Sequence, residues 1–132
     1  MLFANYKQKI LLIDDDASLR RQLNFRLDKC DKFNVIEAEN GKSGLLKANR
    51  QNPDLIILDW VLPDIQGPEV LDQLKNNANT SMIPVLMLTG KNKIGEIEDA
   101  FNRGADAYLA KPFALQNLAE KVSVLLNLPN KK

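Results

Sequence analysis

The 132-residue sequence predicts an α/β fold in which a five-stranded parallel sheet carries helices on both faces. Two observations indicate this class. Short, continuous apolar runs such as Ile10–Ile13 and Leu55–Leu58 are typical of strands covered on both faces, as parallel strands are. These runs alternate with stretches of helical periodicity through short connections. Five such units predict right-handed crossovers and helices on both sides of the sheet.

The first half of the chain contains three strands and two helices, expected at 9–13, 17–29, 34–38, 42–51 and 54–58. In the first helix, Leu19, Leu23 and Leu27 repeat at four-residue spacing and form one apolar face. Asn40 can cap the second helix, because its side-chain oxygen can accept from the free N–H groups of the first turn. Pro53 ends that helix, since the residue before a proline avoids the helical conformation.

The second half contains three helices and two strands, expected at 69–75, 84–88, around 94–101, 107–110 and 115–126. Pro84 stands first in its strand, where its missing N–H matters least. Asn92 can cap the following helix, and Gly104 can end it. The apolar residues of the last helix are expected to face inward: Leu118, Val122 and Leu125.

Composition favours one globular domain, expected over residues 9–128 between an N-terminal extension (1–8) and a loose tail (129–132). The sequence is 45% apolar and 27% charged, which is typical of folded domains. A net charge of +1 gives no support for nucleic-acid binding, and no apolar run is long enough to span a membrane. Cys30 is the only cysteine, which excludes an internal disulfide and fits a reducing compartment such as the cytoplasm. The absence of histidine excludes a His-based triad and a histidine phosphate relay within the chain.

Carboxylates follow two of the predicted strands. Asp14, Asp15 and Asp16 come after the first strand, and Asp59 follows the third. In open α/β sheets, ligands bind at the carboxyl ends of the strands. Adjacent carboxylates repel one another unless a cation lies among them, and Mg²⁺ takes about six oxygen ligands. The alternative is a turn of solvated acids, which we favour for Asp16 as a cap of the next helix, while Asp59 can be a loop acid or a nucleophile toward a phosphoryl group.

Two further polar residues end predicted strands. Lys111 emerges from an apolar run, where an ammonium group needs an anion unless its long side chain reaches water. The hydroxyl of Thr89 can bind a phosphoryl oxygen, although a threonine at a strand end is usually structural. The coincidence of these residues with the acids at strand ends favours one shared site for a divalent cation and a phosphoryl group.

Four motifs, LLIDDD, DLIILDWVLPDIQGPEVL, VLMLTG and GADAYLAKPF, together resemble the CheY-like receiver domain of two-component response regulators over residues 9–127. The resemblance implies a doubly wound, flavodoxin-like sheet in the order 2-1-3-4-5. It implies that Asp59 takes a phosphoryl group from the phosphohistidine of a sensor histidine kinase or a histidine phosphotransfer protein. The chain would not be an enzyme beyond assisting its own phosphorylation and slow dephosphorylation.

The same resemblance assigns a Mg²⁺ site. Asp15 and Asp59 would bind the ion directly, together with the backbone carbonyl of Val61. Asp14 would act largely through water.

It also assigns a switch. Lys111 would pair with the Asp59 carboxylate and later with the phosphoryl group, and the Lys111–Pro112 bond would be cis. Thr89 would move toward the phosphoryl group, and Tyr108 would turn inward to fill the vacated space. The surface of the fourth helix, fifth strand and last helix would then change and contact a downstream effector protein or domain.

Some positions depart from the family pattern. Gly90 replaces the usual alanine or serine, and Ala114 lacks a side chain that could cap the last helix. That helix carries Lys121 but no arginine, so the oligomeric state stays open. Val61 and Lys91 provide no group that orients water, which predicts slow self-dephosphorylation.

Three alternatives remain. A flavodoxin-type cofactor binder would need a loop of Gly, Ser and Thr N–H groups where this chain has acids. A metal-dependent phosphohydrolase would use Asp14 and Asp16 in a DxD pattern and would leave Asp59 without a role. A degenerate receiver would bind partners without being phosphorylated.

Overall fold

The structure, a computed structural model, describes residues 7–28, 32–90 and 94–127. Its elements in chain order are β1 (Gln8–Ile13), α1 (Ala17–Asp28), β2 (Phe33–Ala38), α2 (Gly41–Gln51), β3 (Leu55–Asp59), α3 (Gly67–Asn76), β4 (Val85–Thr89), α4 (Ile94–Asn102), β5 (Ala107–Ala110) and α5 (Leu115–Asn127). Every pair of neighbouring strands is parallel, and the strand order is β2-β1-β3-β4-β5. The predicted doubly wound fold is confirmed.

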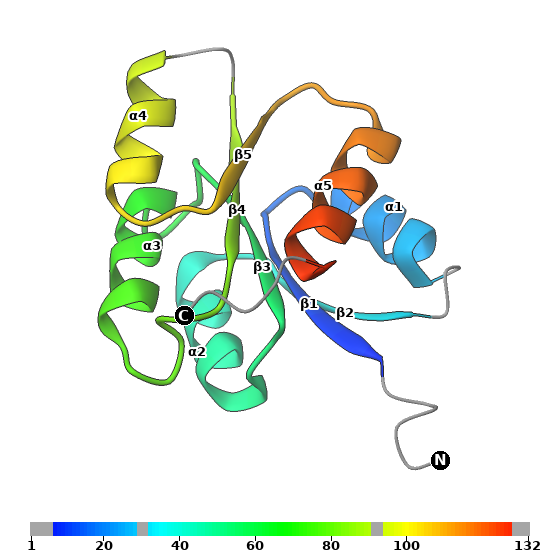
Figure 1. Cartoon of the computed structure of the whole chain (residues 1–132), viewed down its shortest axis with the longest axis horizontal. Coiled ribbons are helices and arrows are strands. Elements are labelled where there is room, and N and C mark those ends of the chain that lie inside the picture. The colour runs from blue at the N-terminus through cyan, green and yellow to red at the C-terminus, as the bar shows by residue number, and fades with distance from the viewer. Residues whose placement is uncertain (1–6, 29–31, 91–93, 128–132) are drawn as a thin grey trace.

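Two helical layers cover the sheet, with α2, α3 and α4 on one face and α1 and α5 on the other (Figure 1). The pleat of β1 shows how one strand serves both layers. Leu11 and Ile13 belong to the core on the α2–α4 side, whereas Ile10 and Leu12 belong to the core on the α1 and α5 side. All four are fully buried. A strand with two buried faces has no polar face, which explains the continuous apolar runs in the sequence.

The strand bounds differ from the prediction by single residues. β1 begins at Gln8, inside the segment expected to be an N-terminal extension, and β2 begins at Phe33. Pro84 lies just before β4, where its carbonyl still accepts from Ile56 N at 3.0 Å. Asp59 and Thr89 are the last residues of β3 and β4, so each leaves the sheet edge directly from a strand.

The helix starts follow local capping chemistry. Asn40 caps α2 as predicted, since its side chain accepts from Ser43 N at 2.8 Å. α3 begins at Gly67, two residues earlier than expected, with Pro68 in its first turn. Within the described part of the chain, no helix combines the length and apolar character needed to cross a membrane.

Helix ends also match their signals. Gly104 has a φ of 106°, a left-handed conformation that favours glycine, and follows α4 as the predicted stop. The expected cap Asn92 lies outside the described residues, as do Lys91, Cys30 and the tail 129–132.

Candidate functional site

The carboxyl ends of β1, β3, β4 and β5 meet at one edge of the sheet because the strands are all parallel. Asp59 ends β3 opposite Leu88, and Thr89 ends β4 opposite Ala110. Asp14 directly follows β1, and its N–H continues the ladder by donating to the Ala38 carbonyl at 3.1 Å. The topology therefore delivers acids, a hydroxyl and a lysine to the same place.

Asp14 is the most enclosed acid of this edge, with no solvent exposure. Its Oδ1 accepts from the backbone N–H of Asp16 at 2.9 Å, and its Oδ2 accepts from Lys111 Nζ at 2.9 Å. Both carboxylate oxygens are thus held, one by the backbone of the following turn and one by the amine of Lys111, which follows β5.

Lys111 bridges two carboxylates. Besides its bond to Asp14, its Nζ lies 3.3 Å from Asp59 Oδ2. Burial acts to lower the pKa of the Lys111 amine. The hydrogen bond to Asp14 and the negative charge of Asp59 outweigh burial and raise that pKa, so the amine is charged across the physiological range.

Asp59 has a perturbed pKa. Burial and the negative charge of Asp14 raise the pKa of its carboxyl group from 3.8 to about 6, against the opposing effect of Lys111. Lys111 therefore does not offset burial and the Asp14 charge, and a further cation beside Asp59 would favour its ionised form.

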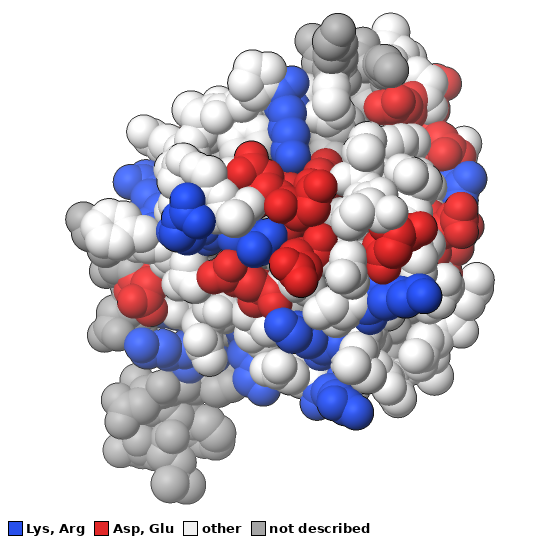
Figure 2. Space-filling model, turned by 180° about the vertical axis from the view of Figure 1, so that it is seen from behind, with Lys and Arg blue, Asp and Glu red and all other residues white. Residues whose placement is uncertain are grey.

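The carboxylates of Asp14, Asp15 and Asp59 form a cluster in which one oxygen from each lies within 4.8 Å of the others. Asp15 is exposed, whereas its two partners are buried. Hard carboxylate oxygens suit Mg²⁺, which binds oxygen ligands and keeps several waters, so the cluster fits this ion. On the face shown in Figure 2, acidic side chains gather in a central group with basic side chains around it, and further acidic side chains lie toward the right edge.

Thr89 carries a buried hydroxyl with no partner. Its side chain is fully buried, and its Oγ1 has no hydrogen bond in the described part of the chain. Such a hydroxyl costs free energy in the folded state, and it suits a ligand oxygen that arrives at this edge. The adjacent backbone is fixed, because Lys111 N donates to the Thr89 carbonyl at 2.6 Å.

Asp16 has the structural role that we favoured. Its Oδ1 accepts from Ser18 N at 3.0 Å and from Leu19 N at 3.2 Å, which caps the first turn of α1. Its side chain is exposed and is not part of the acidic cluster.

The loop after β3 is tied to the site edge. Trp60 N donates to the Leu88 carbonyl at 2.9 Å, and Gly67 N donates to the Trp60 carbonyl at 2.8 Å. Val61 is 63% exposed, so its backbone is carried on an open loop next to Asp59. In the loop that follows β5, the Lys111–Pro112 peptide bond is cis.

Our sequence reasoning missed two residues near this edge. Asp64 accepts from Gly41 N at 2.7 Å and from Lys42 N at 2.9 Å, which ties the loop after β3 to the start of α2. Although desolvation acts to raise the pKa of Asp64, these backbone donors lower it to about 2. Arg20 donates to the Asp14 carbonyl at 2.8 Å. A helical-wheel reading of the first turn of α1 would have placed Arg20 on the side facing the strand end.

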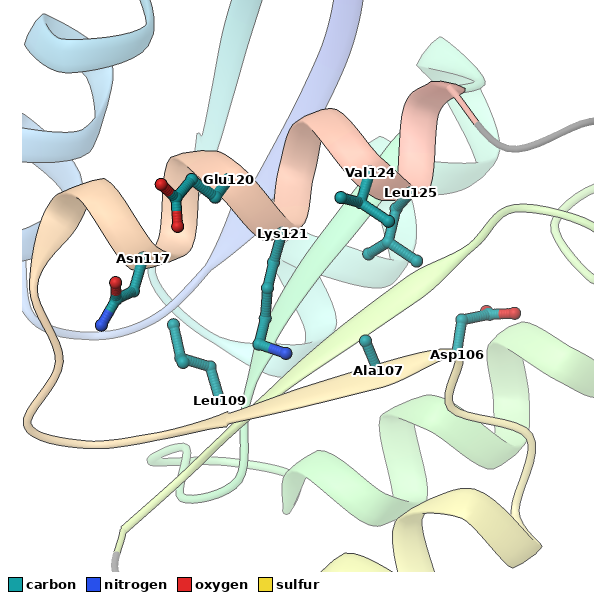
Figure 3. Close-up of a pocket in the computed structure, with 8 residues that line it drawn as sticks. All are labelled: Asp106, Ala107, Leu109, Asn117, Glu120, Lys121, Val124 and Leu125. Carbon is teal, nitrogen blue, oxygen red and sulfur yellow. The ribbon is translucent and has the colours of Figure 1, made fainter.

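Tyr108 lies half-buried on β5. Its ring makes an edge-to-face contact with Phe101 of α4, with ring centroids 5.8 Å apart, and Lys121 Nζ of α5 lies 5.9 Å from its centroid. Beside it, a hollow of about 480 Å³ lies between β5 and α5. Side chains of both elements point into that hollow, among them Leu109 and Lys121 (Figure 3).

Comparison with known sequences identifies relatives of this chain. A family model described as the response regulator receiver domain matches residues 10–123. The alkaline phosphatase synthesis transcriptional regulatory protein PhoP of Bacillus subtilis is 37% identical over 90% of this chain and 48% of its own length. The phosphate regulon transcriptional regulatory protein PhoB of Klebsiella pneumoniae is 37% identical over 90% of this chain and 52% of its own length. The chain thus spans about half the length of these curated relatives.

Solved structures show the same architecture. The chemotaxis response regulator CheY4 of Vibrio cholerae superposes with a TM-score of 0.86 at 27% identity, covering 92% of this chain and 100% of that one. The receiver domain of the Francisella response regulator 1452 superposes with a TM-score of 0.83 at 27% identity, covering 91% of this chain and 97% of that one.

Proposed function

This chain belongs to the response regulator receiver domain family, a family of signalling domains rather than classical enzymes, and we propose that it signals by accepting a phosphoryl group on Asp59. The donor is the phosphohistidine of a sensor histidine kinase or a histidine phosphotransfer protein. The observation that carries this proposal is the placement of Asp59 at a strand end, beside a lysine amine 3.3 Å away and two further acids.

The chemistry follows from the groups present. An oxygen of the Asp59 carboxylate attacks phosphorus, an O–P bond forms, and the N–P bond to the donor histidine breaks with its electron pair returning to the ring nitrogen. With a pKa of about 6, Asp59 is mostly ionised near neutral pH and can act as this nucleophile. Lys111 is charged, and its amine moves from the Asp59 carboxylate to a phosphoryl oxygen.

Three acids and one carbonyl are the proposed Mg²⁺ ligands. Asp15 and Asp59 would hold the ion together with the backbone carbonyl of Val61, and Asp14 would act largely through water. A Mg²⁺ ion held there would neutralise charge on the phosphoryl oxygens during transfer. The acids provide the oxygen ligands. Without a cation their carboxylates repel one another, and this repulsion favours the binding of a cation.

The output is a surface change on α4, β5 and α5. The Thr89 hydroxyl, which has no hydrogen bond among the described residues, gains a phosphoryl oxygen after phosphorylation, so its side chain is pulled toward Asp59. Tyr108, which contacts Phe101 on one side and lies near Lys121 on the other, turns into the vacated space. A local charge thereby biases a two-state element whose surface meets a downstream effector protein or domain.

Intact mass spectrometry after incubation with acetyl phosphate and Mg²⁺ tests the proposal. We expect a gain of one phosphoryl group that disappears with EDTA and in Asp59→Asn. Asp16→Asn is the matched control, because asparagine can still cap α1, and it is expected to be phosphorylated like the wild type. Phosphorylation of Asp59→Asn, or none of the wild type, would show that this chain does not work in the proposed way.

A further inference from the structure

We propose that Arg20 is a positioning residue of the acidic pocket: its guanidinium, braced by Glu37, fixes the peptide unit that joins Asp14 to Asp15 and so places their carboxylates for a cation. The proposal deepens the Mg²⁺ site proposed above and rests on it. Arg20 itself touches neither the cation nor the phosphoryl group in this account.

The guanidinium makes two bonds in different directions. Its NH1 donates to the Asp14 carbonyl oxygen at 2.8 Å, and its Nε donates to Glu37 Oε1 at 3.1 Å. The Arg20 side chain is only 15% exposed. Because the donors of a guanidinium are held in one rigid plane, the position of Glu37 determines where NH1 points.

Glu37 is itself held firmly. Its second carboxylate oxygen, Oε2, accepts from Asn24 Nδ2 at 2.9 Å, so both oxygens have donors from α1. Its backbone carbonyl accepts from Lys47 Nζ of α2 at 2.5 Å. Glu37, which braces Arg20, is therefore anchored by residues on both faces of the sheet.

The peptide unit after Asp14 is the point where this network meets the site. The N–H of Asp14 is bound to β2 through Ala38, and its carbonyl is bound to α1 through Arg20. Asp15 is exposed, so the direction of its side chain depends on the backbone that precedes it. A fixed Asp14 carbonyl therefore fixes the backbone position from which the Asp15 side chain extends.

Electrostatics alone predicts the opposite sign of effect. Arg20 is a cation beside an acidic pocket, and removing it would strengthen Mg²⁺ binding if only charge mattered. Positioning predicts weaker binding, since loss of a group that orients ligands typically lowers metal affinity by about 10-fold or more. The direction of the change thus separates the two roles.

Calorimetric titration of the full chain with MgCl₂ tests the inference. We expect Arg20→Gln to bind Mg²⁺ about 10-fold more weakly. Arg20→Lys restores the charge but not the planar fork, so it is not expected to restore affinity. Arg21→Gln removes the same charge from the neighbouring exposed residue and is expected to bind at least as tightly as the wild type.

Affinity equal to or tighter than that of the wild type in Arg20→Gln would overturn the inference. If Arg20→Gln shows no cooperative thermal unfolding, Glu37→Asp replaces it, because aspartate keeps the negative charge but is too short to hold Arg20 Nε in the same place. A weaker loss of Mg²⁺ affinity is then expected, and an unchanged affinity would count against the inference. Asp15→Asn is titrated alongside. Binding of Mg²⁺ by the wild type, together with loss of binding in Asp15→Asn, would support the proposed metal site. A failure of the inference about Arg20 can then be distinguished from a failure of that site. A wild type that does not bind Mg²⁺ would overturn the proposed site and this inference together.

Discussion

As the proposed phosphoryl acceptor, Asp59 has to meet two requirements that oppose each other. A nucleophilic carboxylate must be ionised near neutral pH, yet this residue is 7% exposed and lies beside the buried Asp14. Burial and the Asp14 charge raise its pKa to about 6, and Lys111 limits the rise. The site therefore keeps Asp59 ionised at a cost in stability, which a bound cation would offset.

This cost predicts a pH-dependent effect of Asp59→Asn. The unfolded chain releases the Asp59 proton near pH 3.8 and the folded chain near pH 6, so wild-type stability falls as pH rises between these values. Without Mg²⁺ near neutral pH, Asp59→Asn is expected to be more stable by about 1–3 kcal/mol. Below the lower pKa the difference should vanish, because both side chains are then neutral.

Urea denaturation of both proteins in EDTA, across this pH range, measures the difference. Addition of Mg²⁺ near neutral pH is expected to stabilise the wild type more than the variant. A variant that is less stable than the wild type in EDTA near neutral pH would contradict the assigned environment of Asp59.

At the scale of elements, the start of α3 determines how the loop after Asp59 runs. The backbone of Gly67 packs directly on this loop, and a Cβ at this position would overlap the Asp59 carbonyl oxygen and lie 2.8 Å from Trp60 Cα. Both neighbours are backbone atoms, which cannot rotate away as a side chain can. Glycine at 67 is thus a condition for the close approach of α3 to the end of β3.

Gly67→Ala is therefore expected to destabilise the fold by about 1–3 kcal/mol, as overpacking does. Gly95→Ala is the matched control, since nothing lies within 4 Å of a Cβ there. It is in α4, where alanine favours the helix, so a gain of up to about 1 kcal/mol is expected. Thermal unfolding of both variants checks the pair, and equal effects would show that the loop adapts to a side chain at 67.

Much of the element structure could be predicted because it depends on local signals. Apolar runs marked the five strands, and Asn40 and Gly104 marked a helix start and a helix end. The early start of α3 could not be predicted in this way. Pro68 is typical of a first helical turn, but the sequence does not show that the backbone of Gly67 packs against the end of β3.

The composition of the site was partly predictable for a different reason. Parallel topology alone brings strand ends together, so Asp14, Asp59 and Lys111 could be expected at one edge. The finer contacts were not predictable, because they depend on side-chain conformations across long sequence separations. Lys111 lies closer to Asp14 than to Asp59, and Arg20 reaches back to the Asp14 backbone.

At the scale of the whole molecule, β4 and β5 connect the acidic edge to the α4–β5–α5 surface. Thr89 pairs with Ala110 and its carbonyl accepts from Lys111 N, so the two residues that we propose to bind the phosphoryl group lie at adjacent, hydrogen-bonded strand ends. Tyr108 lies two residues before Ala110 on the same strand. In the proposed switch, a change at Thr89 would reach Tyr108 through these paired strand ends.

Thr89→Ala is expected to separate site occupation from output. Beryllofluoride with Mg²⁺ should still protect amides beside Asp59, while the change in hydrogen exchange over α4, β5 and α5 should be lost. Thr89→Ala removes a buried hydroxyl that has no hydrogen bond among the described residues, which favours the folded state, and a buried methyl group, which disfavours it, so the two effects oppose and stability is expected to change little. Thr89→Ser keeps the hydroxyl and should respond like the wild type. An unchanged response of these elements in Thr89→Ala would show that the signal takes another route.

The most direct test of the whole account asks which residue carries the phosphoryl group. Borohydride reduces an aspartyl phosphate to homoserine, and peptide mass spectrometry assigns the product to one position. After treatment with acetyl phosphate and Mg²⁺, we expect homoserine at position 59 alone. Homoserine at 14, 15 or 16, or at no position, would contradict the assignment of Asp59 as the phosphoryl acceptor.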